Sequence, residues 1–205
     1  MIRLLFLIVP AALAVMRLRL KKYPYSAAVT LSCAAIVALT GLDDGGTLMA
    51  IGLIVSAVGD WMLAHQVGHP DRFIKGVGLF AAGHLWFIAY AARTAAFALW
   101  PVIAINALTA GYALYLTRRV LPGQTGLISA ALPLYALISL CGLLFALLRA
   151  APVADKALYA LGIASIIFSD TMIAENEFAK NKRAARWVLP TYYLCHILLA
   201  ASRLV

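Results

Sequence analysis

Apolar residues are grouped along the chain in long runs, which short polar and charged stretches separate. Each run has close to the 20 or so residues that an α-helix needs to cross a membrane. None shows the strict apolar–polar alternation of a half-buried strand. The pattern predicts eight transmembrane helices, over residues 2–20, 26–42, 47–65, 73–92, 97–117, 125–149, 153–176 and 187–204. Residues 1–205 are therefore expected to form a single all-α, polytopic membrane domain.

The composition agrees with this pattern. Hydrophobic residues make up 64% of the chain, charged residues make up 12%, and the mean hydropathy is +0.93. A soluble domain has about 25% charged residues. A soluble enzyme of this composition is excluded, and the eight helices leave little sequence for a second domain.

Lysine and arginine are distributed unevenly between the two predicted sides of the membrane. The loops after the first, third, fifth and seventh apolar runs hold 12 of the 17, and the other side holds 5. Because basic loops stay in the cytoplasm, both termini are predicted to lie outside, in a multi-pass protein of the inner (plasma) membrane. The basic residues that follow the first run also favour an uncleaved first helix over a signal peptide.

The net charge of +9 comes largely from these loops. A basic loop beside a membrane predicts contact with anionic lipid headgroups. No nucleic-acid-binding module is recognisable in the sequence, so no nucleic-acid partner is expected. The sequence leaves the oligomeric state open.

Two apolar hairpins share a polar pattern. Asp60 lies near the end of one run and is followed by His84 in the next, and Asp170 and His196 repeat this arrangement. Both aspartates belong to the pattern Asp-x-Met-[Leu/Ile]-Ala. This similarity predicts a duplication, with repeats over residues 1–92 and 97–204, related by a pseudo-two-fold axis along the membrane normal.

The two carboxylates and two imidazoles are the candidate catalytic residues. Placing an aspartate in a membrane-spanning helix costs about 2.5–3.5 kcal/mol on insertion scales, so such a residue usually has a role. Asp60 and Asp170 are predicted in the cytoplasmic half of inward-running helices, and His84 and His196 near the middle of outward-running ones. All four are expected to line one cavity. The alternatives are interhelical hydrogen bonds for the aspartates and buried neutral rings for the histidines.

Polar and aromatic neighbours of these four residues are predicted to contact a substrate. Ser56 precedes Asp60 by one helical turn, and the two tyrosines that precede His196 by three and four residues flank its ring. The full predicted set is Ser56, Trp86, Ser169, Tyr192 and Tyr193.

A metal site is the alternative use of the same side chains. Asp60, His84, Asp170 and His196 could bind zinc together with a water. His65 and His69 also have helical spacing, but they fall where a loop is expected. We predict that the protein needs neither a metal nor another cofactor.

Two further groups of residues are given structural roles. Cys33, Cys141 and Cys195 are expected to be small buried residues, not a disulfide or a metal site. Glu175 and Glu177 are expected at a solvated helix end, and the alternative there is a headgroup site in the basic loop that follows.

Several short motifs resemble those of the YhhN-like lysoplasmalogenase family. They are Gly59-Asp60, the Gly-x-Phe-x-x-x-His segment from Gly78 to His84, Phe168-Ser169-Asp170 followed by Ala174 and Phe178, and Tyr192-Tyr193-x-x-His196 followed by Ser202. The resemblance implies hydrolysis of the vinyl ether bond of lysoplasmalogens, which releases a fatty aldehyde and a glycerophospho-headgroup. The implied partners are a lysophospholipid substrate and membrane lipids.

The implied reaction suits the residues at hand. Vinyl ether hydrolysis starts with proton transfer to carbon and needs a general acid, but no serine or cysteine nucleophile. Paired carboxylates do comparable work in glycosidases. Asp60 or Asp170 would be the acid, and the other carboxylate would stabilise the cation and orient water with His84. A proton-coupled lipid or small-molecule transporter, or a lipid-binding scaffold, is the competing prediction.

Overall fold

The computed structural model describes residues 2–22, 24–42, 45–65 and 70–205, and all its regular elements are helical. A short 3₁₀ segment, Ile2–Leu7, leads into the first α-helix, and a π-helical turn, η2 (Leu116–Val120), extends the fifth. The α-helices are α1 (Ile8–Leu20), α2 (Pro24–Leu39), α3 (Gly46–Ala64), α4 (Pro70–Ala92), α5 (Leu99–Tyr115), α6 (Leu127–Leu148), α7 (Val153–Glu177) and α8 (Ala185–Ser202).

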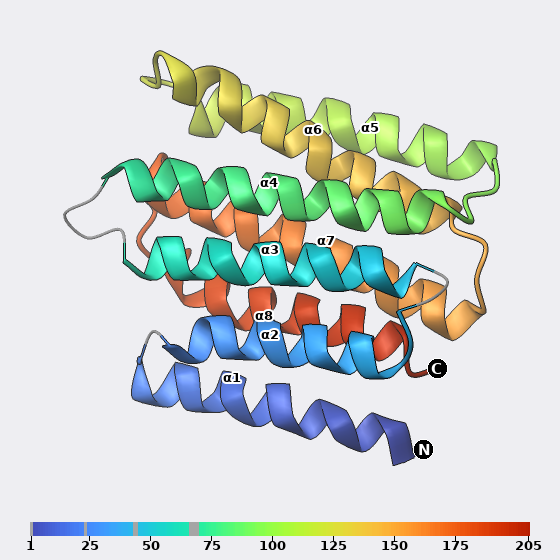
Figure 1. The fold of residues 1–205 in the computed structure, drawn as a ribbon. Helices are drawn as coiled ribbons and strands as arrows, with labels where there is room; N and C mark the ends of the chain where they lie inside the picture. The colour runs from blue at the N-terminus through green and yellow to red at the C-terminus, as the bar shows by residue number, and fades with distance from the viewer. Residues whose placement is uncertain (1, 23, 43–44, 66–69) are drawn as a thin grey trace.

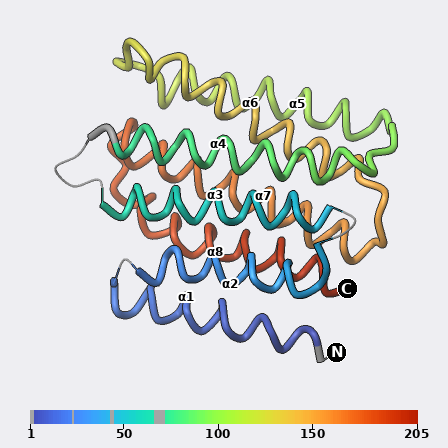
Figure 2. The backbone as a smooth tube through the Cα atoms, in the orientation of Figure 1, coloured from blue at the N-terminus to red at the C-terminus, as the bar shows by residue number. Residues whose placement is uncertain are grey.

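The helices run roughly antiparallel in two layers (Figure 1). In one layer α3 packs between α2 and α4, and in the other α7 packs between α6 and α8. Contacts of α2 with α8 and of α4 with α6 close the layers into a ring, and α1 and α5 lie at its outer edges. The backbone trace in Figure 2 shows both termini at one end of the bundle, and the C-terminal ends of α1, α3, α5 and α7 at the other. The basic loops therefore share one end, which we call the basic end.

The expected helices are all present, with ends that differ by a few residues. Among the described residues, five helical segments are long and apolar enough to cross a membrane: Gly46–Ala64, Arg72–Ala92, Leu99–Val120, Leu127–Leu148 and Val153–Glu177. Helix α2 is apolar but has only 16 residues. These segments make the chain a membrane protein by length and composition.

In both predicted hairpins, a glycine lies where the two helices are in close contact. A methyl group added at Gly52 of α3 would lie 2.6 Å from the Phe87 ring and 3.2 Å from the Gly83 carbonyl oxygen of α4. One added at Gly162 of α7 would lie 3.1 Å from Leu199 and 3.2 Å from the Cys195 carbonyl oxygen of α8. A glycine thus lets the second helix approach closely in both hairpins. The four-helix repeat and its origin by duplication stay predictions.

The end opposite the basic loops contains a buried ion pair that the sequence did not suggest. The Arg149 guanidinium donates to both carboxylate oxygens of Asp155, at 2.6 and 2.8 Å, and to the Tyr90 hydroxyl at 2.7 Å. It also lies 5.3 Å from the centre of the Tyr159 ring. Arg149 is 7% exposed and Asp155 is 8% exposed. The pair ties the start of α7 to the ends of α4 and α6.

Removing one partner of this pair should destabilise the fold strongly. Asp155→Ala leaves the Arg149 guanidinium buried without its counter-charge, which typically costs about 3–5 kcal/mol. We expect a marked fall in the thermal unfolding temperature of the purified protein in detergent. The double variant Arg149→Met with Asp155→Leu should recover much of that loss, because it leaves no buried charge. Equal unfolding temperatures for wild type and Asp155→Ala would contradict this account.

Candidate functional site

A cavity of about 300 Å³ lies between α4, α6 and α7, with Tyr112 of α5 and Leu116 of η2 on its remaining side. Its walls are almost entirely apolar, and Asp170 supplies its only carboxyl group among the described residues. Leu127 and Leu134 also line it and are 65% and 60% exposed. The cavity therefore joins the apolar outer surface of the bundle, where lipid chains would lie.

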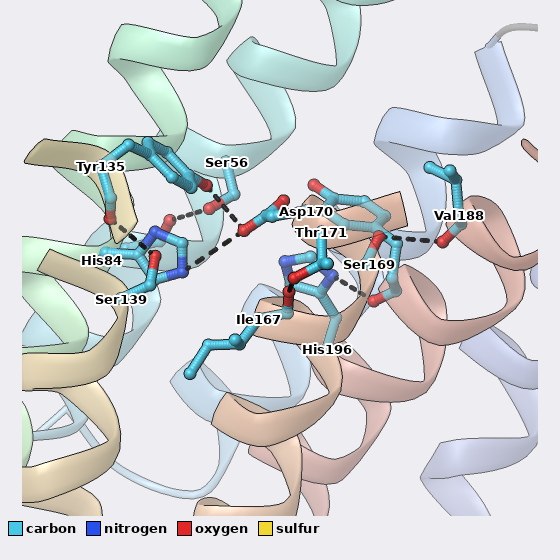
Figure 3. Close-up of polar contacts among 12 residues, drawn as sticks. Ser56, His84, Tyr135, Ser139, Ile167, Ser169, Asp170, Thr171, Val188 and His196 are labelled. Carbon is cyan, nitrogen blue, oxygen red and sulfur yellow. Dashed lines mark hydrogen bonds and ion pairs between the residues drawn. The ribbon is translucent and has the colours of Figure 1, made fainter. Parts of the chain in front are cut away.

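Asp170 on α7 faces polar side chains from two other helices. The Tyr135 hydroxyl of α6 donates to Asp170 Oδ2 at 2.8 Å. The His84 Nε2 atom of α4 lies 3.9 Å from the same oxygen, beyond hydrogen-bond length. Figure 3 shows the Tyr135 and His84 side chains directed toward this carboxyl group from their two helices. Three helices thus position one carboxyl group at a cavity wall.

The two histidines are buried deeply and are near enough to influence each other electrostatically. His84 is 1% exposed and His196 is 0% exposed. His196 Nδ1 lies 3.0 Å from the Tyr192 carbonyl oxygen, one turn earlier on α8. The Nε2 atoms of both histidines have no hydrogen-bond partner among the described residues. Orphaned polar atoms of this kind are where buried water is usually found.

Asp60 has different neighbours. The Thr30 hydroxyl of α2 donates to Asp60 Oδ2 at 2.8 Å. The Tyr192 hydroxyl of α8 lies beside the same carboxyl group, and Arg17 of α1 is close enough to interact with it electrostatically. Asp60 is 7% exposed and does not line the cavity.

The four predicted catalytic residues therefore form two groups with a connection between them. Asp170 and His84 make one group, and Asp60 lies beside Tyr192 in the other. The Tyr192 ring lies 4.4 Å from the His196 ring, and His196 in turn interacts with His84. Of the four, only Asp170 lines the cavity. The direct approach of the two carboxylates in one site stays a prediction.

The five residues predicted to contact a substrate lie off the cavity wall. Ser56 donates to the Gly52 carbonyl oxygen at 2.8 Å, and Ser169 donates to the Val188 carbonyl oxygen at 3.0 Å. The hydroxyls of Tyr193 and Ser26 are 2.6 Å apart and join α8 to α2.

Tyr192 lies in the Asp60 group, and Trp86 is half-buried on α4. The two serines and Tyr193 thus form hydrogen bonds with other groups of the helix bundle. Substrate contact by any of the five stays a prediction.

Glu175 corrects an expectation from the sequence, because it is 7% exposed instead of solvated. It accepts hydrogen bonds from the Tyr115 hydroxyl at 2.8 Å, from Arg119 Nε at 3.3 Å and from Asn181 Nδ2 at 2.8 Å. These bonds fasten the end of α5 and η2 to α7 beside the cavity. Burying a carboxylate without partners has an unfavourable free energy, and the three hydrogen-bond donors offset it.

Within the described part of the chain, no group of three or more His, Cys, Asp or Glu side chains is placed to share a metal ion. The zinc alternative would need at least three of Asp60, His84, Asp170 and His196 to lie close enough to share one ion. His69 of the other candidate pair lies outside the described residues. Cys33 and Cys195 are buried, Cys141 is partly buried, and all three are free thiols, as expected.

Sequence reasoning missed Tyr135, Tyr112, Thr30 and Arg17. Tyr135 and Tyr112 both line the cavity, and the Tyr112 hydroxyl lies 2.7 Å from the Thr171 hydroxyl. Each sits in an apolar helix with no charged residue or histidine within four positions. A tyrosine in such a helix is commonly an interface anchor, so its pattern carries no signal of a site. Only the packing of α6 and α5 against α7 gives these hydroxyls their role.

A family comparison bears on the identity of the chain. The model of the YhhN family matches residues 21–203, which is most of the chain. The chain belongs to the YhhN family. No curated protein and no solved structure matches it. The match covers α2 to α8 and thus every residue of the two polar groups except Arg17.

Proposed function

We propose that this YhhN-family protein hydrolyses the vinyl ether bond of lysoplasmalogens, giving a fatty aldehyde and a glycerophospho-headgroup. The observation that carries the proposal is the carboxyl group of Asp170, which is the only one among the described residues on the wall of a largely apolar cavity. Such a cavity suits an alkenyl chain, because apolar walls bind a chain and one polar group marks the reacting position. Family membership is compatible with this activity.

The depth of Asp170 fits a lysophospholipid that enters from the basic end. Asp170 precedes the end of α7 by seven residues, or roughly 10 Å at about 1.5 Å per residue. A phosphate held by the basic loops would leave the glycerol backbone, and the ether bond attached to it, a short distance inside. The rest of the alkenyl chain would follow the cavity toward Ser139 of α6, deeper in the bundle.

The proposed chemistry begins with Asp170 as the general acid. Its proton passes to the alkenyl carbon beyond the one bonded to oxygen, and the C=C electron pair forms the new C–H bond. The ether oxygen stabilises the resulting oxocarbenium ion, and the Asp170 carboxylate left behind lies near this positive charge. Water oriented by His84 adds to the cationic carbon and returns a proton to Asp170. The hemiacetal then splits into an aldehyde and a free glycerol hydroxyl.

We propose the following membrane topology for the bundle. All eight helices would span the inner membrane, including α1, α2 and α8, which are shorter or more polar than the five long apolar segments. Both termini would face outside, because the basic loops share the opposite end of the bundle and basic loops stay in the cytoplasm.

The test of this function uses the purified protein and two lysolipids with the same headgroup. One carries a vinyl ether and the other an ester at the same position. We expect aldehyde release from the vinyl ether and no fatty acid release from the ester, since no activated nucleophile is proposed. Flux of lipid or protons in proteoliposomes without aldehyde release would instead support the transporter alternative.

Filling the cavity should weaken the binding of long alkenyl chains. Gly78 of α4 lines the cavity, and a Cβ atom added there would meet no other atom within 4 Å. The Gly78→Leu variant should fold and should lower kcat/KM for a long-chain substrate by about 10-fold or more, because its side chain takes the space of several methylene groups. Gly111→Leu is the control, since Gly111 also has open space but lies off the cavity. Equal kcat/KM in both variants would show that the alkenyl chain of the substrate binds outside this cavity.

A further inference from the structure

The Tyr135 side chain contacts two residues of the proposed hydrolytic site. It extends from α6 to the cavity wall, where its ring meets the His84 ring edge-on with 5.4 Å between centres. Its hydroxyl donates to Asp170 Oδ2 at 2.8 Å. One residue therefore contacts both the proposed acid and the histidine proposed to orient water.

The direction of this hydrogen bond distinguishes the two oxygens of Asp170. The Tyr135 hydroxyl is the donor in this bond, so Oδ2 of Asp170 is the acceptor. His84 Nε2 faces the same oxygen from 3.9 Å. A protonated carboxyl group has one O–H, and with Oδ2 accepting from Tyr135 that O–H belongs on Oδ1.

We propose that Tyr135 is a positioning residue that fixes the acidic proton on Asp170 Oδ1 and stabilises the carboxylate formed when that proton is transferred. The inference rests on the proposed hydrolysis. In the transfer, the Oδ1–H bond breaks and a C–H bond forms, and negative charge spreads onto Oδ2. The Tyr135 hydrogen bond strengthens at that moment, since bonds to an ionised acceptor are about twice as strong as neutral ones. An interaction that strengthens in the transition state raises kcat.

The Tyr135→Phe variant removes only the hydroxyl and keeps the ring against His84. Its kcat should fall about 10-fold while KM changes less than about 2-fold, because the lost bond serves the transition state more than substrate binding. Tyr115→Phe is the matched control: the Tyr115 hydroxyl also donates to a carboxylate at 2.8 Å, that of Glu175, but Tyr115 lies off the cavity. The control should keep kcat within about 2-fold of wild type. A loss of kcat that is equal in both variants would overturn the proposal.

An infrared measurement tests the bond without any turnover. The band that disappears in Asp170→Asn identifies the C=O stretch of protonated Asp170. We expect this band to move to higher wavenumber in Tyr135→Phe, where Oδ2 loses its donor, and to stay in place in Tyr115→Phe. An unshifted band, or no such band in wild type, would overturn the role of Tyr135. A shifted band in a protein that releases no aldehyde would instead overturn the proposed hydrolysis.

Discussion

The Asp170→Asn variant should release aldehyde from a lysoplasmalogen about 10²–10⁴-fold more slowly than wild type, the usual contribution of a general acid. Asparagine keeps the size of the side chain, and its carbonyl oxygen still accepts the Tyr135 hydrogen bond. It cannot, however, donate an acidic proton to carbon. The measurement is the kcat of purified wild type and variant in the same detergent, with unfolding temperatures to show that both are folded.

Glu175→Gln is the matched control for this experiment. Glu175 lies five residues after Asp170 on the same helix, is also buried, and has a side chain off the cavity. Its amide variant keeps one carbonyl oxygen as an acceptor for Tyr115 and loses the oxygen that accepts from Asn181, but because the side chain lies off the cavity, turnover should remain close to wild type. Near-normal aldehyde release by Asp170→Asn would remove the acid from the proposed mechanism.

The Asp60→Asn variant should lose activity on a similar scale, about 10²–10⁴-fold, if two carboxylates act as one unit. Asp60 lies beside Tyr192, whose ring is 4.4 Å from the ring of His196, so coupling to Asp170 would pass through α8. The amide oxygen of the new asparagine would still accept the Thr30 hydrogen bond, so the fold should survive. Groups that act as a unit are not additive, and the double variant with Asp170→Asn should be little slower than either single one.

A contrary pattern would separate the two aspartates. If Asp60→Asn keeps normal turnover while Asp170→Asn loses it, Asp60 is a packing residue that joins α2, α3 and α8. If the effects multiply in the double variant, the two carboxylates act in independent steps. Steady-state rates of the three variants distinguish these cases.

The sequence alone determined the helical class, the approximate helix boundaries and the sharing of one end by the basic loops. Runs of about 20 apolar residues allow little else in a membrane, because each backbone polar group must find a partner within its own helix. The same reasoning drew attention to Asp60, Asp170, His84 and His196, since ionisable residues in such runs are rare. Those positions could be read from residue type and spacing, without contacts between distant segments.

The tertiary structure decided which of these residues face the cavity and what they touch. Tyr135 is 35 residues from Asp170 in sequence and Thr30 is 30 residues from Asp60, so each hydrogen bond depends on how two separate helices rotate and pack. These helices are apolar around most of their circumference, so the periodicity of the sequence does not fix how each one is rotated about its own axis. The Arg149–Asp155 pair and the burial of Glu175 likewise arise where helix ends meet. The local sequence does not predict the burial of either the ion pair or Glu175, because the burial of a charged side chain depends on neighbours that the fold brings to it.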